Sequence, residues 1–468
     1  MGLLKKRENT LRKDTHPFTN LFIILVAVTI LANFIPAGSY ARIEMDGRNV
    51  VDPDSFVFAE EKTYVGVFTF FLSFFQGFQD AASLMAMILF AGAAFGVVTR
   101  IGLMETALKT LVRKLAHTSF YVIAFVLMAV WGTLVAFTSM WELSMVIIPA
   151  VVPLALALGY DVATGAGIII LSSCCGFAAA LSNPLFTAIA HRIAELPIYS
   201  AMWYRAIIFV VMLLICYAFL MIYARRVKKD PSKAIVKVED TKYVAYSAEE
   251  AHFTPALIRA GVVFVLLFAF LIYGTINLGF DFPQMAATFV AMSILVGFAY
   301  GLRLNDVMDM MGEGMKDMFY GAMVMLFARA VLYVMNTAGI IDTIIYYLAQ
   351  VVTSGSAVLT ASLLPILQAI IDFFVPSGSG QAVITIPILV PLGDMSGITR
   401  QVVCLAAQLG DGLANFIMPT EGTLLGILLA AGIPYKKWFK FFAPLWCILM
   451  LTAIVFVIIG VVIHLGPF

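Results

Sequence analysis

The sequence is poor in charged residues and in cysteine, and each shortage excludes a class of protein. Only 12% of its 468 residues are charged and 62% are hydrophobic, whereas about a quarter of the residues in a typical soluble domain are charged. A soluble globular protein is therefore excluded. The five cysteines all lie in apolar sequence, and the adjacent pair Cys174–Cys175 lacks the spacing of a metal or redox motif. We interpret them as small buried hydrophobic residues.

Enzyme motifs are also missing from the chain. It contains no HExxH and no GxSxG sequence, and the run Pro376–Gly380 lacks the Gly-Lys-Ser/Thr ending of a phosphate-binding loop. We predict that the protein is not an enzyme and needs no cofactor.

Long apolar segments are abundant, and about 20 such residues suffice to cross a bilayer as a helix. We predict spans at residues 18–36, 79–99, 203–223, 259–278, 284–301, 319–336 and 442–464. The first follows Lys5-Lys6-Arg7 but is longer than a signal-peptide core, so we expect it to stay uncleaved. The sequence predicts an all-α polytopic protein of the inner (cell) membrane, in contact with the lipid bilayer and without a nucleic-acid partner.

One unusual pattern occurs twice, about 237 residues apart. Each copy has a polar run, then a helix with two prolines, then a second helix that is itself interrupted. The polar runs are Thr138–Glu142 and Pro376–Gln381, and the interruptions are Ser182–Pro184 and Asn415–Thr420. Paired interruptions in the two halves of a membrane protein indicate a binding site near the midplane of a secondary transporter.

The distribution of Lys and Arg orients these segments, because cytoplasmic loops are enriched in both. One arrangement places every basic cluster on the cytoplasmic side, together with the N-terminus. In it, residues 119–158 and 358–392 are re-entrant hairpins that enter from opposite sides, while 163–190 and 398–430 are broken helices. The two repeats are then inverted relative to each other.

The remaining segments are assigned to the membrane surface or to a linker. We expect interfacial helices at residues 65–77, 103–117, 340–352 and around Met308–Met311. Residues 224–257 form the only long polar linker. Gly92-xxx-Gly96 is expected to be a close helix-packing site.

Acidic residues in apolar sequence are costly in a bilayer, so each is a functional candidate. Glu142 lies in the first polar run, Asp372 just before the second, and Asp411 and Glu421 flank the second interruption. An acid can cap a helix N-terminus, which contributes about 0.3–1 kcal/mol, or it can lie beside a substrate or ion. For Glu142 and Glu421 we favour the second interpretation. Arg329, inside a predicted span, is expected to pair with one of these acids or with a substrate carboxylate.

The interruptions supply what a small ligand requires. Half-helix N-termini suit an anionic group, whereas unwound carbonyls and Ser, Thr or Asn oxygens suit Na⁺. The candidate substrate-binding residues are Ser139, Glu142, Asn183, Ser377, Gly378, Ser379, Asn415, Thr420 and Glu421. The candidate Na⁺ ligands are Thr138, Ser139, Asn183, Ser377, Asp411 and Asn415. Gly378 and Gly380 have a simpler interpretation as residues that permit a tight turn.

Several of these motifs resemble a known family. They are Val375–Gln381, Pro387–Leu392, Gly410–Gly412, Pro419-Thr420 and Gly432–Trp438, with Pro153–Asp161 and Asn183-Pro184 in the first half. They are similar to the anaerobic C4-dicarboxylate carrier-like family (DcuC), in particular its YfcC-like branch, which is grouped with ArcD-type arginine/ornithine antiporters. The resemblance covers most of the chain.

The resemblance implies an ion-coupled elevator-type transporter, usually a homodimer, in which a transport domain moves against a scaffold. The implied ranges are 1–118 and 203–356 for the scaffold, which includes the cytoplasmic linker, 119–202 and 357–432 for the transport domain, and 433–468 for a terminal transmembrane helix. Two residues depart from the family's pattern, since Glu421 replaces a small residue after Pro-Thr and Ser139 replaces a glycine in the first polar run. Both touch the expected pocket, so substrate identity is the property that transfers least.

We therefore predict a secondary active transporter of a small charged metabolite, working by symport with Na⁺ or H⁺ or by exchange. Acids outnumber bases around the interruptions, which favours an amino acid, including a basic one, or another cationic substrate. A C4-dicarboxylate would need positive charge, which Arg329 and helix N-termini supply only in part, and both classes stay open. The alternative function is a channel for small solutes or ions.

Overall fold

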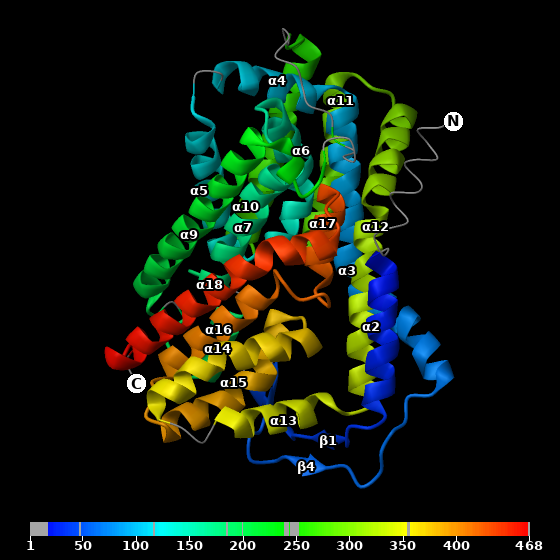
Figure 1. The fold of residues 1–468 in the computed structure, drawn as a ribbon. Helices are drawn as coiled ribbons and strands as arrows, with labels where there is room; N and C mark the ends of the chain where they lie inside the picture. The colour runs from blue at the N-terminus through cyan, green and yellow to red at the C-terminus, as the bar shows by residue number, and fades with distance from the viewer. Residues whose placement is uncertain are drawn as a thin grey trace.

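The computed structural model describes residues 17–45, 48–115, 118–183, 186–198, 200–237, 243, 252–352 and 356–466. Within these residues, nine helices are long and apolar enough to cross a membrane. In Figure 1 the long helices α3 (Val67–Arg100) and α12 (Leu304–Thr337) form a column beside which the other helices are stacked. The chain is thus a mostly helical polytopic protein, as predicted.

The helices of the two halves follow the same order. Those of the first half are α2 (Pro17–Ala32), α3, α4 (Leu103–Leu115), α5 (Phe120–Thr138), the short 3₁₀ helix η1 (Trp141–Leu143), α6 (Ser144–Ala157), α7 (Val162–Ala179), α8 (Thr187–Ile193) and α9 (Met202–Lys229). Those of the second half are η2 (Pro231–Lys233), α10 (Pro255–Asn277), α11 (Phe282–Tyr300), α12, α13 (Ile341–Val352), α14 (Ala357–Phe374), α15 (Gly378–Met395), α16 (Arg400–Ala414), α17 (Gly422–Ala431) and α18 (Tyr435–Val462).

The repeat seen in the sequence is present in the structure, since α3–α9 correspond in order to α12–α18. Helices α3 and α12 are both 34 residues long and begin 237 positions apart. Each is followed by a glycine with positive φ, +78° at Gly102 and +65° at Gly339, a conformation that disfavours residues with a Cβ. The amphipathic helices α4 and α13 start directly after these turns. Figure 1 shows the hairpin α5–α6 in the upper part of the molecule and α14–α15 in the lower part.

Helices α3 and α12 form the most extensive helix pair, and glycines let their backbones touch. A Cβ added to Gly314 would lie 2.2 Å from the carbonyl oxygen of Gly92, and one added to Gly96 would lie 2.6 Å from the Cα of Gly314. Nearer the other end of the pair, a Cβ on Gly77 would lie 2.5 Å from the carbonyl oxygen of Leu326. The prediction of close packing at Gly92-xxx-Gly96 is confirmed.

Two predicted interfacial helices are wrong as separate elements. Residues 65–77 do not lie apart from the following span, because α3 runs unbroken from Val67, and the segment around Met308–Met311 is likewise the first part of α12. Phe68, Phe71 and Phe75 in this first part of α3 remain exposed, whereas Phe74 packs against rings of other helices. The ring of Phe74 lies 5.5 Å from that of Phe327 and 6.4 Å from that of Phe22. The α4 and α13 segments do form separate amphipathic helices.

A small β region was missed by the sequence analysis, so the expected all-α class is mostly helical instead. β1 (Gly38–Ser39) pairs with β4 (Val57–Phe58), and β2 (Arg42–Met45) pairs with β3 (Arg48–Val51), both antiparallel. The region is tied to α13, since Arg42 forms a 2.9 Å ion pair with Asp342 and the Tyr40 amide donates to the same carboxylate at 3.0 Å.

The interior of the molecule is built around α7 and α16. Every residue of α7 is buried, and so is every residue of α16 after Arg400. Helix α7 packs against α5, α6 and α9, and α16 packs in the same way against α14, α15 and α18. The two helices also meet each other, and a Cβ on Gly412 would lie only 2.5 Å from the Cα of Ala178.

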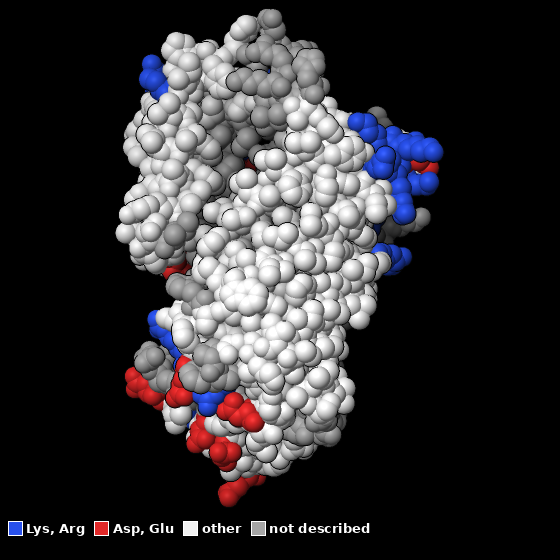
Figure 2. All heavy atoms as spheres, turned by 90° about the vertical axis from the view of Figure 1, so that its left-hand side faces the viewer, with Lys and Arg blue, Asp and Glu red and all other residues white. Residues whose placement is uncertain are grey.

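Charged side chains occupy the ends of the molecule. Figure 2 shows most Lys and Arg of this face gathered on one side of the upper part, and Asp and Glu, with a few bases, at the lower end. The wide band between them carries little charge, which fits a surface that faces lipid.

The glycine contact between α3 and α12 can be tested with two neighbouring substitutions. We expect Gly314→Ala to destabilise the protein by roughly 1–3 kcal/mol, because its new methyl group would overlap the Gly92 backbone. Gly312→Ala, in the same helix with nothing within 4 Å of its Cβ, should be neutral or stabilising by about 0.5–1 kcal/mol. Thermal unfolding of both variants in one detergent makes the comparison. Equal melting temperatures would show that the backbones do not touch.

Candidate functional site

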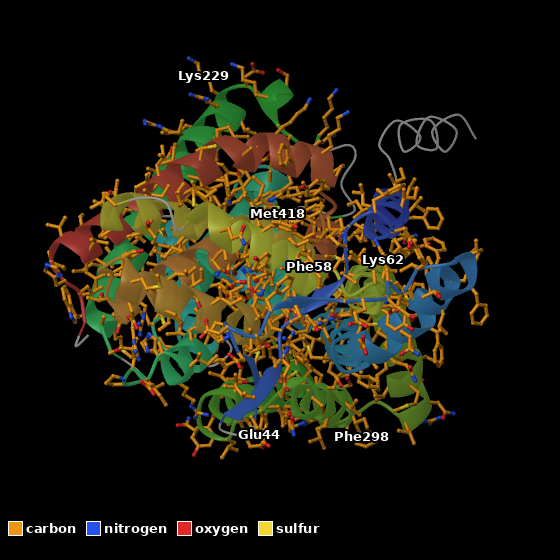
Figure 3. The ribbon with its side chains drawn as sticks, turned by 90° about the horizontal axis from the view of Figure 1, so that it is seen from below. Glu44, Phe58, Lys62, Lys229, Phe298 and Met418 are labelled. Atoms are coloured by element: carbon orange, nitrogen blue, oxygen red, sulfur yellow. The ribbon has the colours of Figure 1, made fainter. Side chains whose placement is uncertain are left out.

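Four interruptions of helical structure converge in the interior. We call them the first tip (Ser139–Leu143), the first break (residues 180–186, with 184 and 185 outside the described residues), the second tip (Val375–Ser377) and the second break (Asn415–Glu421). Figure 3, seen from below, places Met418 of the second break near the middle of the molecule and Lys229, Glu44 and Phe298 toward its rim.

The tips lie close to the breaks. The ring of Trp141 in the first tip lies 4.6 Å from that of Phe416 in the second break. The amide of Ser182 in the first break donates to the carbonyl of Ala136, one turn before the first tip, at 3.3 Å. A Cβ on Gly378, next to the second tip, would lie 3.7 Å from Phe186. The predicted convergence of the two repeats is therefore present.

Hydroxyl groups hold the first tip in place. Helix α5 ends because Ser139 adopts a left-handed conformation, with φ of 62°. The Thr138 hydroxyl donates to Leu134 O at 2.8 Å and accepts from the Met140 amide at 3.2 Å. Ser173 of α7 accepts from the Trp131 indole at 2.8 Å and lies 2.9 Å from the hydroxyl oxygen of Ser144.

The first break is held by side chains from other helices. The Asn183 side chain accepts from the Phe186 amide at 3.0 Å. Gln408 of α16 spans the break, because it donates to Phe177 O at 2.9 Å and accepts from the Thr187 hydroxyl at 3.1 Å. Arg205 of α9 donates to the carbonyl of Leu181 at 3.0 Å.

At the second tip, Ser377 caps α15, as its hydroxyl accepts from the Gly380 amide at 3.4 Å. Residues 376–380 are partly exposed, including Gly378 and Ser379, whereas the first tip is buried. Below the tip, Gln381 donates to the carbonyl of Gln368 at 2.9 Å.

Helix α18 supplies donors to the second break. Trp438 donates to Phe416 O at 3.0 Å, and Tyr435 donates to Ile417 O at 2.7 Å. The Asn415 side chain donates to Asp411 O at 2.7 Å, and Glu421 caps α17 by accepting from the Thr423 amide at 3.1 Å.

The buried acids around this centre lack protein partners. Asp372 and Asp411 are each 0% exposed, and none of their four carboxylate oxygens has a hydrogen-bond partner in the described residues. One oxygen of Glu142 is in the same state. Asp372 lies within electrostatic range of Asp411 and Glu421, and Glu142 lies within range of Glu421. The capping interpretation is therefore wrong for Asp372 and Asp411, whereas Glu421 does cap a helix.

Other unsatisfied oxygens lie in the same place. The hydroxyls of Ser139 and Thr420 are buried and have no partner in the described part of the chain. Arg329 interacts electrostatically with Glu421, but its guanidinium forms no ion pair with a described residue, so the expected structural pairing is not seen. The described residues also contain no cluster of three or more His, Cys, Asp or Glu fit to hold a metal ion. Oxygen atoms with free lone pairs are instead suited to a proton, an alkali cation or a cationic substrate.

Several participants were missed by sequence reasoning. Gln368, Gln408, Ser173 and Arg205 each hold part of the centre. Their common signal is a polar side chain in an otherwise apolar helix.

Similarity to known proteins shows the family of the chain. The sequence pattern of the family described as C4-dicarboxylate anaerobic carrier (DcuC) matches residues 15–462. The chain belongs to this family. It is therefore a multi-pass membrane transporter of a small-molecule substrate and not an enzyme.

Individual relatives cover almost the whole chain. A protein of Escherichia coli (strain K12) named "Putative basic amino acid antiporter YfcC" is 30% identical over 96% of both chains. An uncharacterized protein of Haemophilus influenzae is 28% identical over 96% of this chain and 98% of its own. Among solved structures, the Alcanivorax borkumensis YdaH transporter and Neisseria gonorrhoeae MtrF each show 19% identity and a TM-score of 0.43 over 97% of this chain, covering 100% and 97% of their own.

The two asparagines of the breaks give a direct test of the site. We expect Asn183→Ala and Asn415→Ala to reduce transport at least tenfold, because each side chain fixes main-chain groups where a helix is interrupted. Asn277→Ala is the matched control. The exposed Asn277 side chain also donates to a carbonyl four residues back, at 3.3 Å, but lies at the end of α10. Uptake by reconstituted protein with an unchanged elution profile makes the measurement, and wild-type uptake by both break variants would contradict the site.

Proposed function

We propose that this transporter is a secondary active carrier of a small cationic metabolite, with a basic amino acid as the leading class. The observation that carries the proposal is the group of buried acids without protein partners. Moving a charge out of water costs several kcal/mol per ion even after relaxation, unless an opposite charge compensates it. Oxygens of Asp372, Asp411 and Glu142 are buried without a hydrogen-bond partner among the described residues, so a proton or a bound cation would offset the cost of burying their charge.

The site can also accept the carboxylate of an amino acid. Arg329 lies within electrostatic range of Glu421 and forms no ion pair with the described residues. The N-terminus of α15 at Gly378 is partly exposed and presents amide groups that suit an anion. A basic amino acid carries two cationic groups and one carboxylate, which matches an excess of acids over one arginine.

A C4-dicarboxylate is the second candidate class, and the description of the family favours it. Such a dianion would meet a centre in which four acids face one arginine. The name of the Escherichia coli relative, which refers to basic amino acids, agrees with the first class. In this proposal, transport of the substrate is driven by symport with Na⁺ or H⁺ or by exchange for a second substrate. The alternative function is a channel for small solutes or ions.

The proposal includes an architecture. The hairpins α5–α6 and α14–α15 are re-entrant and enter from opposite sides of the inner membrane, with the N-terminus cytoplasmic. The scaffold consists of residues 1–118 and 203–356, including the linker 224–257, and the closely packed helices α3 and α12 form its centre. The transport domain is 119–202 and 357–432, residues 433–468 form the terminal helix, and the protein works as a homodimer by an elevator movement.

Exchange assays test substrate class and acid role together. We expect liposomes that contain the purified protein to exchange internal arginine or ornithine for external radiolabelled arginine. Asp411→Asn or Asp372→Asn should lower the exchange rate at least tenfold, because each substitution removes a negative charge that would balance the cationic substrate. Asp394→Asn is the control, because this exposed carboxylate of α15 pairs with Arg400 outside the centre. Exchange of succinate but not arginine would establish the second class, and flux without any counter-substrate or ion gradient would indicate a channel.

Thiol labelling tests the opposite entry of the hairpins. In a background with the five native cysteines replaced by alanine, Ser139→Cys and Ser379→Cys preserve side-chain size at the two interruptions. We expect an impermeant maleimide to reach the partly exposed position 379 from the periplasmic side. Position 139 is buried in this conformation, so we expect it to react from the cytoplasmic side only during transport, when a water-filled path opens to it. Modification of both positions from one side only would contradict inverted hairpins.

A further inference from the structure

Helices α9 and α18 form an antiparallel pair on the outside of the helix stack (Figure 1). At one end of the pair, the Tyr204 hydroxyl of α9 donates to Phe456 O of α18 at 2.6 Å. Toward the other end, the ring of Phe441 lies 5.1 Å from that of Phe219 and 4.9 Å from that of Tyr223. The C-terminal end of α9 therefore lies beside the N-terminal end of α18.

Both of these adjoining ends are rich in bases. The last five residues of α9 and the first six of α18 include seven Lys and Arg residues, which we call the basic cluster: Arg225, Arg226, Lys228, Lys229, Lys436, Lys437 and Lys440. All are exposed except Lys437, which is half-buried, and Figure 3 shows Lys229 at the rim of the molecule.

The basic cluster has no acidic counterpart nearby. The only acid in the segments 219–237 and 432–445 is Asp230, which pairs with Lys233 at 3.5 Å. None of the seven bases forms an ion pair with a described residue. Lys436 and Lys437 also lie in the first turn of α18, which contains no acid, although a helix dipole disfavours cations there.

Helical spacing identifies the bases that face the partner helix. Residues three or four apart lie on the same face of a helix. Arg226 follows Tyr223 by three residues, and Lys437 precedes Phe441 by four. Each base therefore lies about one turn beyond the aromatic contact, on the side of its helix that meets the other. Because the helices are antiparallel, both bases lie beyond the same end of that contact, where one anion can meet both.

Apolar side chains are exposed on the same two helices, along the membrane side of the basic cluster. They include Leu214 and Ile222 of α9 and Phe439 and Ile448 of α18. A ligand that joins an anionic head to apolar chains matches both features, whereas an inorganic anion matches only the bases. Bases near a membrane also orient a chain, but that requires only their presence in a cytoplasmic segment. It does not require two helices distant in sequence to bring their bases together.

We propose that the basic cluster binds the phosphate group of an anionic phospholipid, with Arg226 and Lys437 as its principal partners. The acyl chains lie along the exposed apolar side chains of α9 and α18. Clusters of Lys and Arg at the membrane surface attract anionic lipids, and basic sites between transmembrane helices bind their head groups. This interaction goes beyond the proposed function, because it is independent of the substrate class.

Lipid binding by the purified full-length protein in a neutral detergent gives the test. Native mass spectrometry counts bound lipid during titration with phosphatidylglycerol or with phosphatidylcholine. We expect the wild type to bind phosphatidylglycerol more tightly by roughly tenfold or more. Arg226→Gln combined with Lys437→Gln should weaken that binding roughly 25-fold, about fivefold for each base, and leave the binding of phosphatidylcholine unchanged.

Two double variants serve as controls. Arg226→Lys with Lys437→Arg keeps both charges and should bind phosphatidylglycerol as the wild type does. Arg259→Gln with Arg303→Gln removes two exposed bases at the starts of α10 and α12, away from the basic cluster, and should change the affinity by less than about twofold. Inorganic phosphate at matched ionic strength should not displace the bound lipid.

Three results would overturn the proposal. Equal affinity of the wild type for the two lipids would show that the bases only orient the chain. An equal loss of binding in the Arg259 and Arg303 variant would show an effect of net charge without a site. Displacement of phosphatidylglycerol by inorganic phosphate would show a site for a soluble anion. If the Arg226 and Lys437 variant does not fold, Lys440→Gln replaces it, with an expected loss of about fivefold, and unchanged binding would again contradict the site.

Discussion

The close crossing of α7 and α16 is the constraint on which the centre of this protein depends. Gly412 and Ala178 bring the two backbones into contact, and no larger side chain fits between them. Both helices are interrupted within a few residues of this crossing, after Ala179 and after Ala414. The broken ends are therefore held side by side, and each hairpin tip lies near the break of the other repeat. Small residues at helix interfaces commonly allow this approach in membrane proteins.

The crossing also explains why so many polar atoms in the centre lack partners. A helix interruption exposes main-chain groups that lipid cannot satisfy, and here side chains from α9, α16 and α18 satisfy them. The side chains of Arg205, Gln408 and Trp438 donate hydrogen bonds to main-chain carbonyls in or next to the breaks. The carboxylates of Asp372 and Asp411 are left with no donor among the described residues. The residues that hold the breaks in place are thus different from the residues whose carboxylates are unpaired.

The sequence predicted the helices well where composition or repetition was informative. The interruptions were found because polar, Gly- and Pro-rich runs recur at the same spacing, and both predicted broken helices are present as α7–α8 and α16–α17. The predicted helix boundaries were wrong where local composition did not decide where a helix begins. The aromatic run 65–77 resembles a separate surface helix on composition alone, yet α3 begins at Val67 and continues through it without a break. The strands of residues 38–58 were missed because they are short and depend on a partner such as Asp342, 300 positions away from Arg42.

The site residues were harder to predict, because a side chain's partner decides its role and no partner is visible in one sequence. Asn183 and Asn415 were named as ligands, and the structure shows both engaged with the main chain of their own break. Asp372 and Asp411 were suspected of capping, and neither does so. The repeats explain this pattern. A duplicated backbone places equivalent residues at equivalent points, so geometry can be inferred from the repeat. Charge is free to diverge at those points, as it has at Arg205 and Trp438, which each donate to a main-chain carbonyl of the break in their own half.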